Sequence, residues 1–351
     1  MLDIATRDYC RGVLPAVSRT FALGIELLKE PLRDEIGVAY LICRILDTIE
    51  DTTSLPAEAR ASLLRAVPGS ILDPHNWPML AAEIEKMFAD KALAGQDHDL
   101  CRHATTVFKA LHAFRPGARD AMKRSFVEMA EGMAATVDRE LRGEGLKLEN
   151  MEDLHRYCYY VAGTVGMLLT NEFALDRASV TPAVRKQLDR YAVSFGLGLQ
   201  VTNIIKGVTD DIERGVTYVP RSLFKRSGIE LQTLIDNPND PRGREVVAGL
   251  CEQTLLWLDE ALEYTLSVPP LERDIRLFCA LPLTFAVRTL ARALMTSDVF
   301  SESVLKITRD EVKAIHAEVE RNIASDRGLR EIYAREKADA VAEIERAKAP
   351  K

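Results

Sequence analysis

Apolar residues recur at steps of three and four positions along almost the whole chain, and this periodicity constrains the fold most strongly. In the segment EVKAIHAEVERNI, for example, it places four aliphatic side chains on one face of an amphipathic helix. Convincing strand alternation is absent from the sequence. The periodic segments are interrupted where Pro, Gly, Asn and Asp cluster, at 54–60, 71–78, 114–119, 180–184, 236–244 and 267–273. The sequence therefore predicts an all-α protein, a class of fold that builds its sites between facing helices.

The chain shows no sign of a division into domains. Its 351 residues would favour two domains by size alone, but neither a low-complexity linker nor an internal repeat separates one part from another. Apolar residues make up 47% of the chain, enough for one large core. We expect a single all-α domain over 1–351, with about 326–351 forming a charged C-terminal helix or tail.

Charge and cysteine usage limit the partners and the compartment. A net charge of −7 argues against nucleic acid as the main partner, since phosphate binding requires a basic surface. The six cysteines lack a C-x-x-C pair and are interpreted as buried free thiols of a reducing compartment. The N-terminus lacks the pattern of a signal peptide, and no uncharged apolar stretch reaches the roughly 20 residues that span a bilayer. We expect a cytoplasmic protein with at most peripheral contact to the inner face of the membrane, and the sequence implies no protein partner.

A stripe of polar residues interrupts the apolar segment DEIGVAYLICRILDTIED. Aliphatic residues cover most of the circumference of this predicted helix, so it should be largely buried. Tyr40, Arg44, Asp47 and Asp51 nevertheless follow one another at helical steps on one stripe, and Glu50 flanks it. Charges without partners are costly to bury. The stripe should therefore face a water-filled cavity, an ion or a ligand.

A second polar stripe lies in the segment GLQVTNIIKGVTDDIERGVTYVP. Gln200, Asn203, Gly207 and the pair Asp210–Asp211 again follow three- and four-residue steps. Two such helices facing each other would offer the oxygen ligands that Mg²⁺ or Mn²⁺ prefers, shared with substrate phosphates. The histidines form no metal-spaced pair, which disfavours zinc, and no phosphate-binding P-loop is present.

Cationic and hydroxyl side chains accompany both stripes. The tetrapeptide SRTF places an arginine beside two hydroxyls ahead of another apolar segment, and further cations stand on or beside the acidic stripes. Each of them is by default a surface or ion-pair residue. Together they suit a diphosphate held by a metal ion on one side and by guanidinium groups on the other. The candidate substrate-binding residues are Ser18, Arg19, Phe21, Tyr40, Arg44, Gln200, Lys206 and Arg214.

Several blocks together resemble the squalene/phytoene synthase family. They are SRTF, YLICRILDTIED, YCYYVAGTVG, GLGLQVTNII with the two following acids, and FCALP, and their order and spacing agree from about Tyr9 to Lys306. YCYYVAG and FCALP are more similar to squalene synthases than to phytoene synthases. The resemblance implies an isoprenoid-synthase helical bundle with a central cavity. It also implies head-to-head condensation of two farnesyl diphosphates through presqualene diphosphate to squalene, a sterol or hopanoid precursor, with Mg²⁺ and NADPH.

The resemblance also implies roles for individual residues. The first aspartate-rich motif corresponds to Asp47, Glu50 and Asp51, and the last two acids of the second motif correspond to Asp210 and Asp211, all as metal ligands. Asp47 and Asp51 are then also catalytic. Tyr157 matches a tyrosine that takes part in proton removal while the cyclopropane forms. Asn203 and Lys306 match residues at the NADPH end of the site.

Two positions depart from the family pattern. Gly207 stands where the second acidic motif normally begins with Asp, and Thr308 stands where an arginine follows Lys306 near the NADPH phosphates. The first departure puts one metal site in doubt, and the second puts the use of NADPH in doubt. Three alternatives therefore stay open. They are a dehydrosqualene- or phytoene-type synthase that needs no reductant, an enzyme that stops at presqualene diphosphate, and a non-catalytic prenyl-diphosphate binder.

Overall fold

The regular structure of the chain is helical throughout its described part. The computed structural model describes residues 2–296, 300 and 305–348, and none of these forms a strand. This confirms the predicted all-α class. The helices form two units, one of residues 1–145 and 164–185 and the other of 146–163 and 186–351. The expectation of a single domain stays a prediction, and each unit is described by itself.

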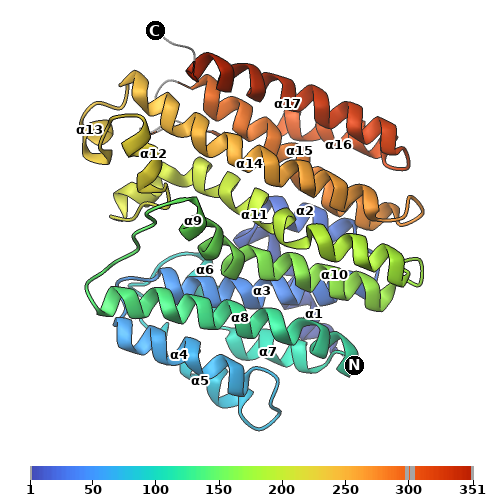
Figure 1. The fold of residues 1–351 in the computed structure, drawn as a ribbon. Coiled ribbons are helices and arrows are strands. Elements are labelled where there is room, and N and C mark those ends of the chain that lie inside the picture. Colours follow the sequence, from blue (N-terminus) through green and yellow to red (C-terminus); the bar gives the residue numbers. More distant parts are fainter. Residues whose placement is uncertain (1, 297–299, 301–304, 349–351) are drawn as a thin grey trace. The chain divides into compact units, whose positions relative to one another are not determined.

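Unit 1 consists of helices joined by short connections (Figure 1). The breaks predicted at 54–60 and 114–119 fall where α4 and α8 begin, each at a proline-containing turn, as fits the fixed φ angle of proline. Its helices are α1 (Ile4–Val17), α2 (Arg19–Leu27), α3 (Leu32–Asp51), α4 (Ala57–Ser70), α5 (Trp77–Met87), α6 (Gln96–Cys101), α7 (Ala104–His112), α8 (Pro116–Leu141) and α10 (Thr164–Asp176).

Helix α3 is the central element of unit 1, and it packs against α1, α4, α7 and α8. Its aliphatic side chains Leu41, Ile42, Ile45 and Leu46 are fully buried, as the sequence predicts. Acidic residues in its first turn suit the positive end of the helix dipole. Its last turn holds no basic residue, so the acids there stand at the unfavourable, negative end.

Unit 2 contains the second acidic stripe and the C-terminal helices. The long helix α11 begins at the end of unit 1 and carries this stripe within unit 2. A π-helical turn, η1, directly follows α9. The elements are α9 (Met151–Cys158), η1 (Tyr159–Gly163), α11 (Pro182–Glu213), α12 (Arg221–Arg226), α13 (Leu231–Asp236), α14 (Pro241–Ser267), α15 (Arg273–Met295), α16 (Arg309–Asn322) and α17 (Asp326–Lys348).

The C-terminal helices α14, α15 and α17 pack side by side (Figure 1). Among the described residues, α15 is the one helix long and apolar enough to cross a membrane, but 89% of its apolar window is buried inside the protein. The C-terminal segment is helix α17. It buries Leu329, Ile332 and Tyr333, while Lys337 on its flank donates to Asp259 of α14 at 2.6 Å. Apolar packing and ion pairs therefore fix this charged segment within unit 2.

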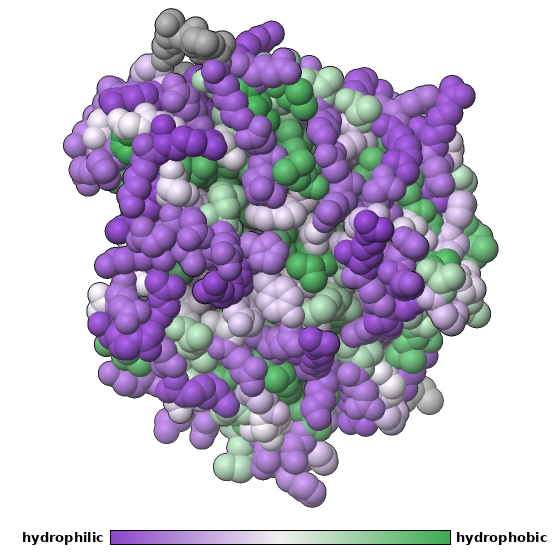
Figure 2. Space-filling view, viewed as in Figure 1, coloured by the Kyte–Doolittle hydropathy of each residue, from purple (hydrophilic) through white to green (hydrophobic). Residues whose placement is uncertain are grey.

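The surface agrees with the composition. The face shown in Figure 2 is mostly hydrophilic, with hydrophobic residues in small separate groups. The most exposed large apolar side chains, Ile4, Met79 and Leu271, lie on three different segments. Scattered apolar residues of this kind are normal on a protein surface.

Candidate active site

The polar stripe of α3 is open although the rest of the helix is buried. Tyr40, Arg44, Asp47 and Asp51 are all partly exposed. Arg44 lies between its neighbours on the stripe, donating to the Asp47 carboxylate at 2.8 Å and to the Tyr40 hydroxyl at 2.9 Å. Arg44 thus stands one helical turn from both Tyr40 and Asp47. Asp47 and Asp51 lie on the same side of the helix. This arrangement can receive a phosphate through the guanidinium and a cation through the carboxylates.

Helix α6 adds two residues to this stripe that the sequence did not indicate. Asp97 places Oδ1 3.9 Å from Arg44 Nε, and this oxygen has no hydrogen-bond partner among the described residues. His98 Nε2 lies 3.2 Å from the hydroxyl of Thr52, directly after the last residue of α3. Burial acts to lower the pKa of Arg44, but the charges of Asp47 and Asp97 and the Tyr40 hydroxyl outweigh it and raise that pKa. Arg44 therefore stays charged throughout the physiological range.

The segment SRTF contacts the N-terminal part of the α3 stripe, at Tyr40. Ser18 caps α2 by accepting a hydrogen bond from the backbone N–H of Phe21 at 3.2 Å. The ring of Phe21 lies 5.8 Å from that of Tyr40, whose hydroxyl donates to the Val17 carbonyl at 3.4 Å. Ser18, Phe21, Tyr40 and Arg44 are therefore brought together. Arg19 begins α2, but its side chain lies outside the described part of the structure.

Glu50 is not on the open face. Its side chain is only 6% exposed, and neither carboxylate oxygen has a hydrogen-bond partner among the described residues. Burial, followed by the charges of Asp51 and Asp47, raises the pKa of Glu50 well above its ordinary value. Of the three acids in the first motif, Asp47 and Asp51 are thus the two that stand on the open stripe.

The second stripe on α11 is open as well. Asn203, Lys206 and Asp210 are exposed and Gln200 is partly exposed, whereas the intervening aliphatic residues are buried. Asp211 is turned inward, with 7% exposure, and accepts a hydrogen bond from Arg214. Burial raises the pKa of Asp211, although Arg214 opposes the shift. The two adjacent acids therefore have different surroundings.

Tyr157 contacts the segment that follows α11. Its ring centre is 4.9 Å from that of Tyr218, which follows α11 and was not singled out from the sequence. The π-helical turn η1 begins two residues later, and such turns are frequent at functional sites. Helix α11 approaches η1 very closely, because a Cβ on Gly196 would stand 2.2 Å from the carbonyl oxygen of Ala162. The absence of a side chain at Gly196 allows this approach.

At the predicted NADPH end of the site, the structure gives a local role to the threonine at position 308. Thr308 caps α16, accepting from the N–H of Glu311 at 3.2 Å, while its own N–H donates to the Glu311 carboxylate at 2.8 Å. This capping box gives threonine a local role where the family pattern has arginine. Lys306 is exposed and precedes the cap. The T-x-x-E spacing that marks the cap was present in the sequence.

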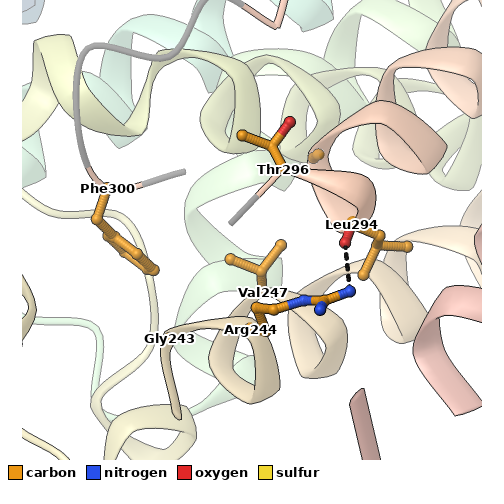
Figure 3. Close-up of a pocket in the computed structure, with 7 residues that line it drawn as sticks. Gly243, Arg244, Val247, Leu294, Thr296 and Phe300 are labelled. Atoms are coloured by element: carbon orange, nitrogen blue, oxygen red, sulfur yellow. Dashed lines mark hydrogen bonds between the residues drawn. The ribbon is translucent and has the colours of Figure 1, made fainter. Parts of the chain in front are cut away.

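A pocket in unit 2 lies apart from these residues. It is lined by Gly243, Arg244 and Val247 of α14, by Leu294 and Thr296 at the end of α15, and by Phe300 (Figure 3). Arg244 crosses it and donates to the Leu294 carbonyl at 3.1 Å. None of the predicted site residues lines this pocket.

The carboxylates of each stripe do not form a complete metal cage. Within the described residues, no three His, Cys, Asp or Glu side chains are arranged to hold a metal ion. Mg²⁺ commonly binds to one or two carboxylates and completes its shell with waters and substrate phosphates. The pair Asp47 and Asp51 in unit 1 and the pair Asp210 and Asp211 in unit 2 fit that mode, since each pair supplies two carboxylates with hard oxygen donors.

Comparisons with known proteins agree with these features. The family model described as squalene/phytoene synthase matches residues 14–311. Squalene synthase of Schizosaccharomyces pombe is 28% identical, with 84% of this chain and 61% of that protein covered. Squalene synthase 1 of Arabidopsis thaliana is 30% identical, with coverages of 86% and 68%. The chain thus spans about two thirds of the length of the curated relatives that it matches.

Solved structures share the fold. The complex of TcSQS with the ligand E5700 superposes with a TM-score of 0.77 at 25% identity, covering 98% of this chain and 99% of that one. A dehydrosqualene synthase in complex with a ligand gives a TM-score of 0.66 at 21% identity, with coverages of 92% and 97%. The second similarity concerns the fold alone.

Proposed function

Because the chain belongs to the squalene/phytoene synthase family, we propose that it condenses two farnesyl diphosphates head-to-head to squalene. The reaction passes through presqualene diphosphate, whose reduction uses NADPH. The observation that carries this proposal is the open stripe of Arg44, Asp47 and Asp51 on an otherwise buried helix. The squalene synthases among the relatives support farnesyl diphosphate as the substrate.

The stripe of α3 supplies what ionisation of an allylic diphosphate requires. Asp47 and Asp51 would hold Mg²⁺, which, when bound, offsets the negative charge of the departing diphosphate. Arg44 stands beside Asp47 and Asp97, and it would contribute a directed guanidinium to the same phosphates. Fixed charges of this kind stabilise the developing anion without reorganising during the reaction. Ser18, Arg19, Phe21 and Tyr40 complete the proposed substrate site.

On α11, Gln200, Lys206 and Arg214 are proposed to contact substrate, and Asp210 and Asp211 are proposed to hold metal. Asn203 and Lys306 are proposed to contact NADPH. Lys206 is exposed beside the acids, as a phosphate ligand must be. Lys306 is likewise exposed and offers a cation to a phosphate of NADPH.

Tyr157 is proposed to assist removal of the proton that leaves when the cyclopropane forms. We expect Tyr157→Phe to lower the rate of presqualene diphosphate formation by on the order of 10²-fold, because a positioned acid–base group contributes at least that much. The ring contact with Tyr218 is retained in this variant, so substrate affinity should change little. Single-turnover measurement of the intermediate checks this. Tyr160→Phe, two positions beyond the end of α9, is the matched control, and formation of the intermediate at the wild-type rate by Tyr157→Phe would remove Tyr157 from the chemistry.

Gly207 is proposed to mark a missing metal ligand. An added Cβ at this position meets no atom within 4 Å, so a side chain fits there. A carboxylate at position 207 would be one turn from Asp211 and next to Asp210 on the helix. We expect Gly207→Asp to lower the Mg²⁺ concentration for half-maximal turnover about threefold, with nearly unchanged stability because the lost glycine flexibility offsets the added repulsion between carboxylates. Gly207→Asn is the uncharged control, and an unchanged Mg²⁺ dependence in Gly207→Asp would show that the position has another role.

The compartment is proposed to be the cytoplasm, with peripheral contact to the inner face of the membrane where the apolar product leaves. All six cysteines are free, and five of them are buried. Free thiols are typical of a reducing compartment.

Product identification tests the proposed function. Purified protein is incubated with farnesyl diphosphate and Mg²⁺, with and without NADPH, and the products are identified by mass spectrometry. We expect presqualene diphosphate without NADPH and squalene with it. Dehydrosqualene in both reactions would favour a reductant-independent enzyme, and presqualene diphosphate in both would show that the reaction stops there. Binding of farnesyl thiodiphosphate without turnover of farnesyl diphosphate would favour a non-catalytic binder.

A further inference from the structure

The acidic residues at the C-terminal end of α3 are not balanced by any basic residue in its last turn. Asp47, Glu50 and Asp51 lie within its last five residues, at the negative end of the helix dipole, and its last turn contains no basic residue. Asp47 and Asp51 stand four residues apart on the helix and also repel each other as like charges. A helix end of this kind tends to fray unless another element supplies a cation and donors for its last carbonyl groups.

Arg60 of α4 supplies both the cation and the hydrogen-bond donors. It lies in the first turn of α4 and is 1% exposed, which makes it one of the largest fully buried side chains of the chain. Its Nη1 donates to the backbone carbonyl of Glu50 at 2.5 Å, and its Nε donates to that of Leu55 at 3.3 Å. One guanidinium thus connects the last turn of α3 with the far end of the loop that leads into α4.

Glu140 holds this guanidinium from the other side. Its two carboxylate oxygens, in the last turn of α8, accept from Arg60 Nη2 at 2.6 and 2.7 Å. Three elements of unit 1 therefore meet at one buried cation. Lysine cannot reproduce this arrangement, because its three donors radiate from one atom and lack the rigid planar fork of arginine.

We propose that Arg60, oriented by Glu140, is a positioning residue that fixes the end of α3 on which Asp47 and Asp51 stand. Arg60 contacts neither substrate nor metal; it sets the direction in which the two carboxylates point. This inference rests on the proposed function for the identity of the ligands, whereas the positioning itself is a property of α3. A displacement of about 1 Å at such a site is expected to cost substantial activity.

Three variants of the full chain test the proposal. Arg60→Lys keeps the charge but loses the fork, and Glu140→Gln keeps Arg60 but weakens its anchor. Arg65→Met is the matched control, since Arg65 joins the same helices α4 and α8 through Asp138 at 2.7 Å but is exposed. Far-UV circular dichroism and thermal unfolding establish that each variant is folded.

Two readouts separate positioning from general stability. Hydrogen exchange of a peptide covering residues 44–56 reports directly on the end of α3, and titration with Mn²⁺ in the presence of inorganic pyrophosphate, followed by electron paramagnetic resonance, reports on the metal site. For Arg60→Lys we expect exchange at least tenfold faster in this peptide and a Mn²⁺ dissociation constant about tenfold higher. Glu140→Gln should shift both in the same direction by about threefold, and Arg65→Met should leave both unchanged.

The outcomes are distinct. A folded Arg60→Lys protein with wild-type exchange in residues 44–56 overturns the positioning role, and so does an equal change in Arg65→Met. Faster exchange with an unaltered Mn²⁺ affinity also overturns it, because Arg60 would then be a merely structural residue. A wild-type protein that binds Mn²⁺ and pyrophosphate but yields no prenyl product contradicts the proposed function and leaves both readouts for Arg60 interpretable.

Discussion

Asp51→Asn is expected to lower kcat/KM with farnesyl diphosphate by on the order of 10³-fold while the protein stays folded. Asp51 is one of two carboxylates on the open stripe of α3, and stabilisation of the departing diphosphate by a bound metal ion amounts to several kcal/mol. Each 1.4 kcal/mol corresponds to about a factor of ten in rate. An amide has half the oxygen donors and no charge, so most of that stabilisation is lost.

The stability of Asp51→Asn should change in the opposite direction. Removing one negative charge from the C-terminal turn of α3 relieves repulsion and an unfavourable dipole interaction, which is expected to contribute about 0.5 kcal/mol. Steady-state kinetics at varied Mg²⁺ and urea unfolding measure the two effects. Glu58→Gln, an exposed carboxylate seven residues further on, is the control and should alter neither. Near-normal activity of Asp51→Asn would contradict the metal assignment.

The helical class and the central helix of the site were predictable because both depend on local pattern. The aliphatic residues of α3 form a broad apolar surface, and the structure buries Leu41, Ile42, Ile45 and Leu46 as expected. The resemblance to the squalene/phytoene synthase family is confirmed by the match over residues 14–311. The division into two compact units was not predicted. Two of its boundaries, at 163/164 and 185/186, pass within helical segments, and the third falls in the loop between α8 and α9.

Some residues of the candidate site could not be predicted from the sequence because they lie on other elements. Asp97 reaches Arg44 from α6, the ring of Tyr218 contacts that of Tyr157 after α11 has ended, and Arg60 reaches the carbonyl of Glu50 from α4. In sequence each is an ordinary polar residue in a charged or turn segment, because the geometry that gives it a role is tertiary. Glu50 illustrates the converse: the resemblance to the family implies a third metal ligand there, and the structure shows a side chain that is only 6% exposed. Its role as a ligand stays a prediction.

A second carboxylate in unit 1 is buried in a way that no sequence pattern indicated. Glu172 of α10 is fully buried, and neither of its oxygens has a hydrogen-bond partner among the described residues. Glu35 of α3 lies beside it and already accepts from Arg115 at 3.1 and 3.3 Å. Burial first, and then the adjacent Glu35, raise the pKa of Glu172 to about 9. We infer that Glu172 stays protonated at neutral pH, where it faces the negative charge of Glu35.

This shift has a definite consequence for stability. Below the ordinary pKa of 4.5 the folded and unfolded chains both carry the proton on Glu172, so the site costs nothing. As the pH rises above 4.5 the unfolded chain releases this proton while the folded chain retains it, and the free energy of unfolding falls. The decline continues until the folded group also ionises near pH 9. Its slope approaches about 1.4 kcal/mol per pH unit for one full proton.

Glu172→Gln should remove this pH dependence. The amide carries no charge and leaves nothing to titrate at this position, so we expect the variant to be about 2–4 kcal/mol more stable than wild type at pH 8. At pH 5 the two proteins should differ by less than about 1 kcal/mol, because little of the linked proton release has then occurred. Urea unfolding from pH 5 to pH 8 measures both values.

Glu336→Gln is the matched control for this prediction. Glu336 is a buried glutamate too, but it accepts from Arg288 at 2.6 and 2.8 Å and thus has the cationic partner that Glu172 lacks. Its neutralisation removes the charge of the carboxylate that holds Arg288 most closely and leaves only Glu311, at 3.3 Å, as counter-ion, so this variant should be less stable than wild type at pH 8. The difference between the two glutamates is then the presence of a partner and not burial itself. If Glu172→Gln were as destabilising as Glu336→Gln at pH 8, the protonation of Glu172 in the folded protein would be refuted.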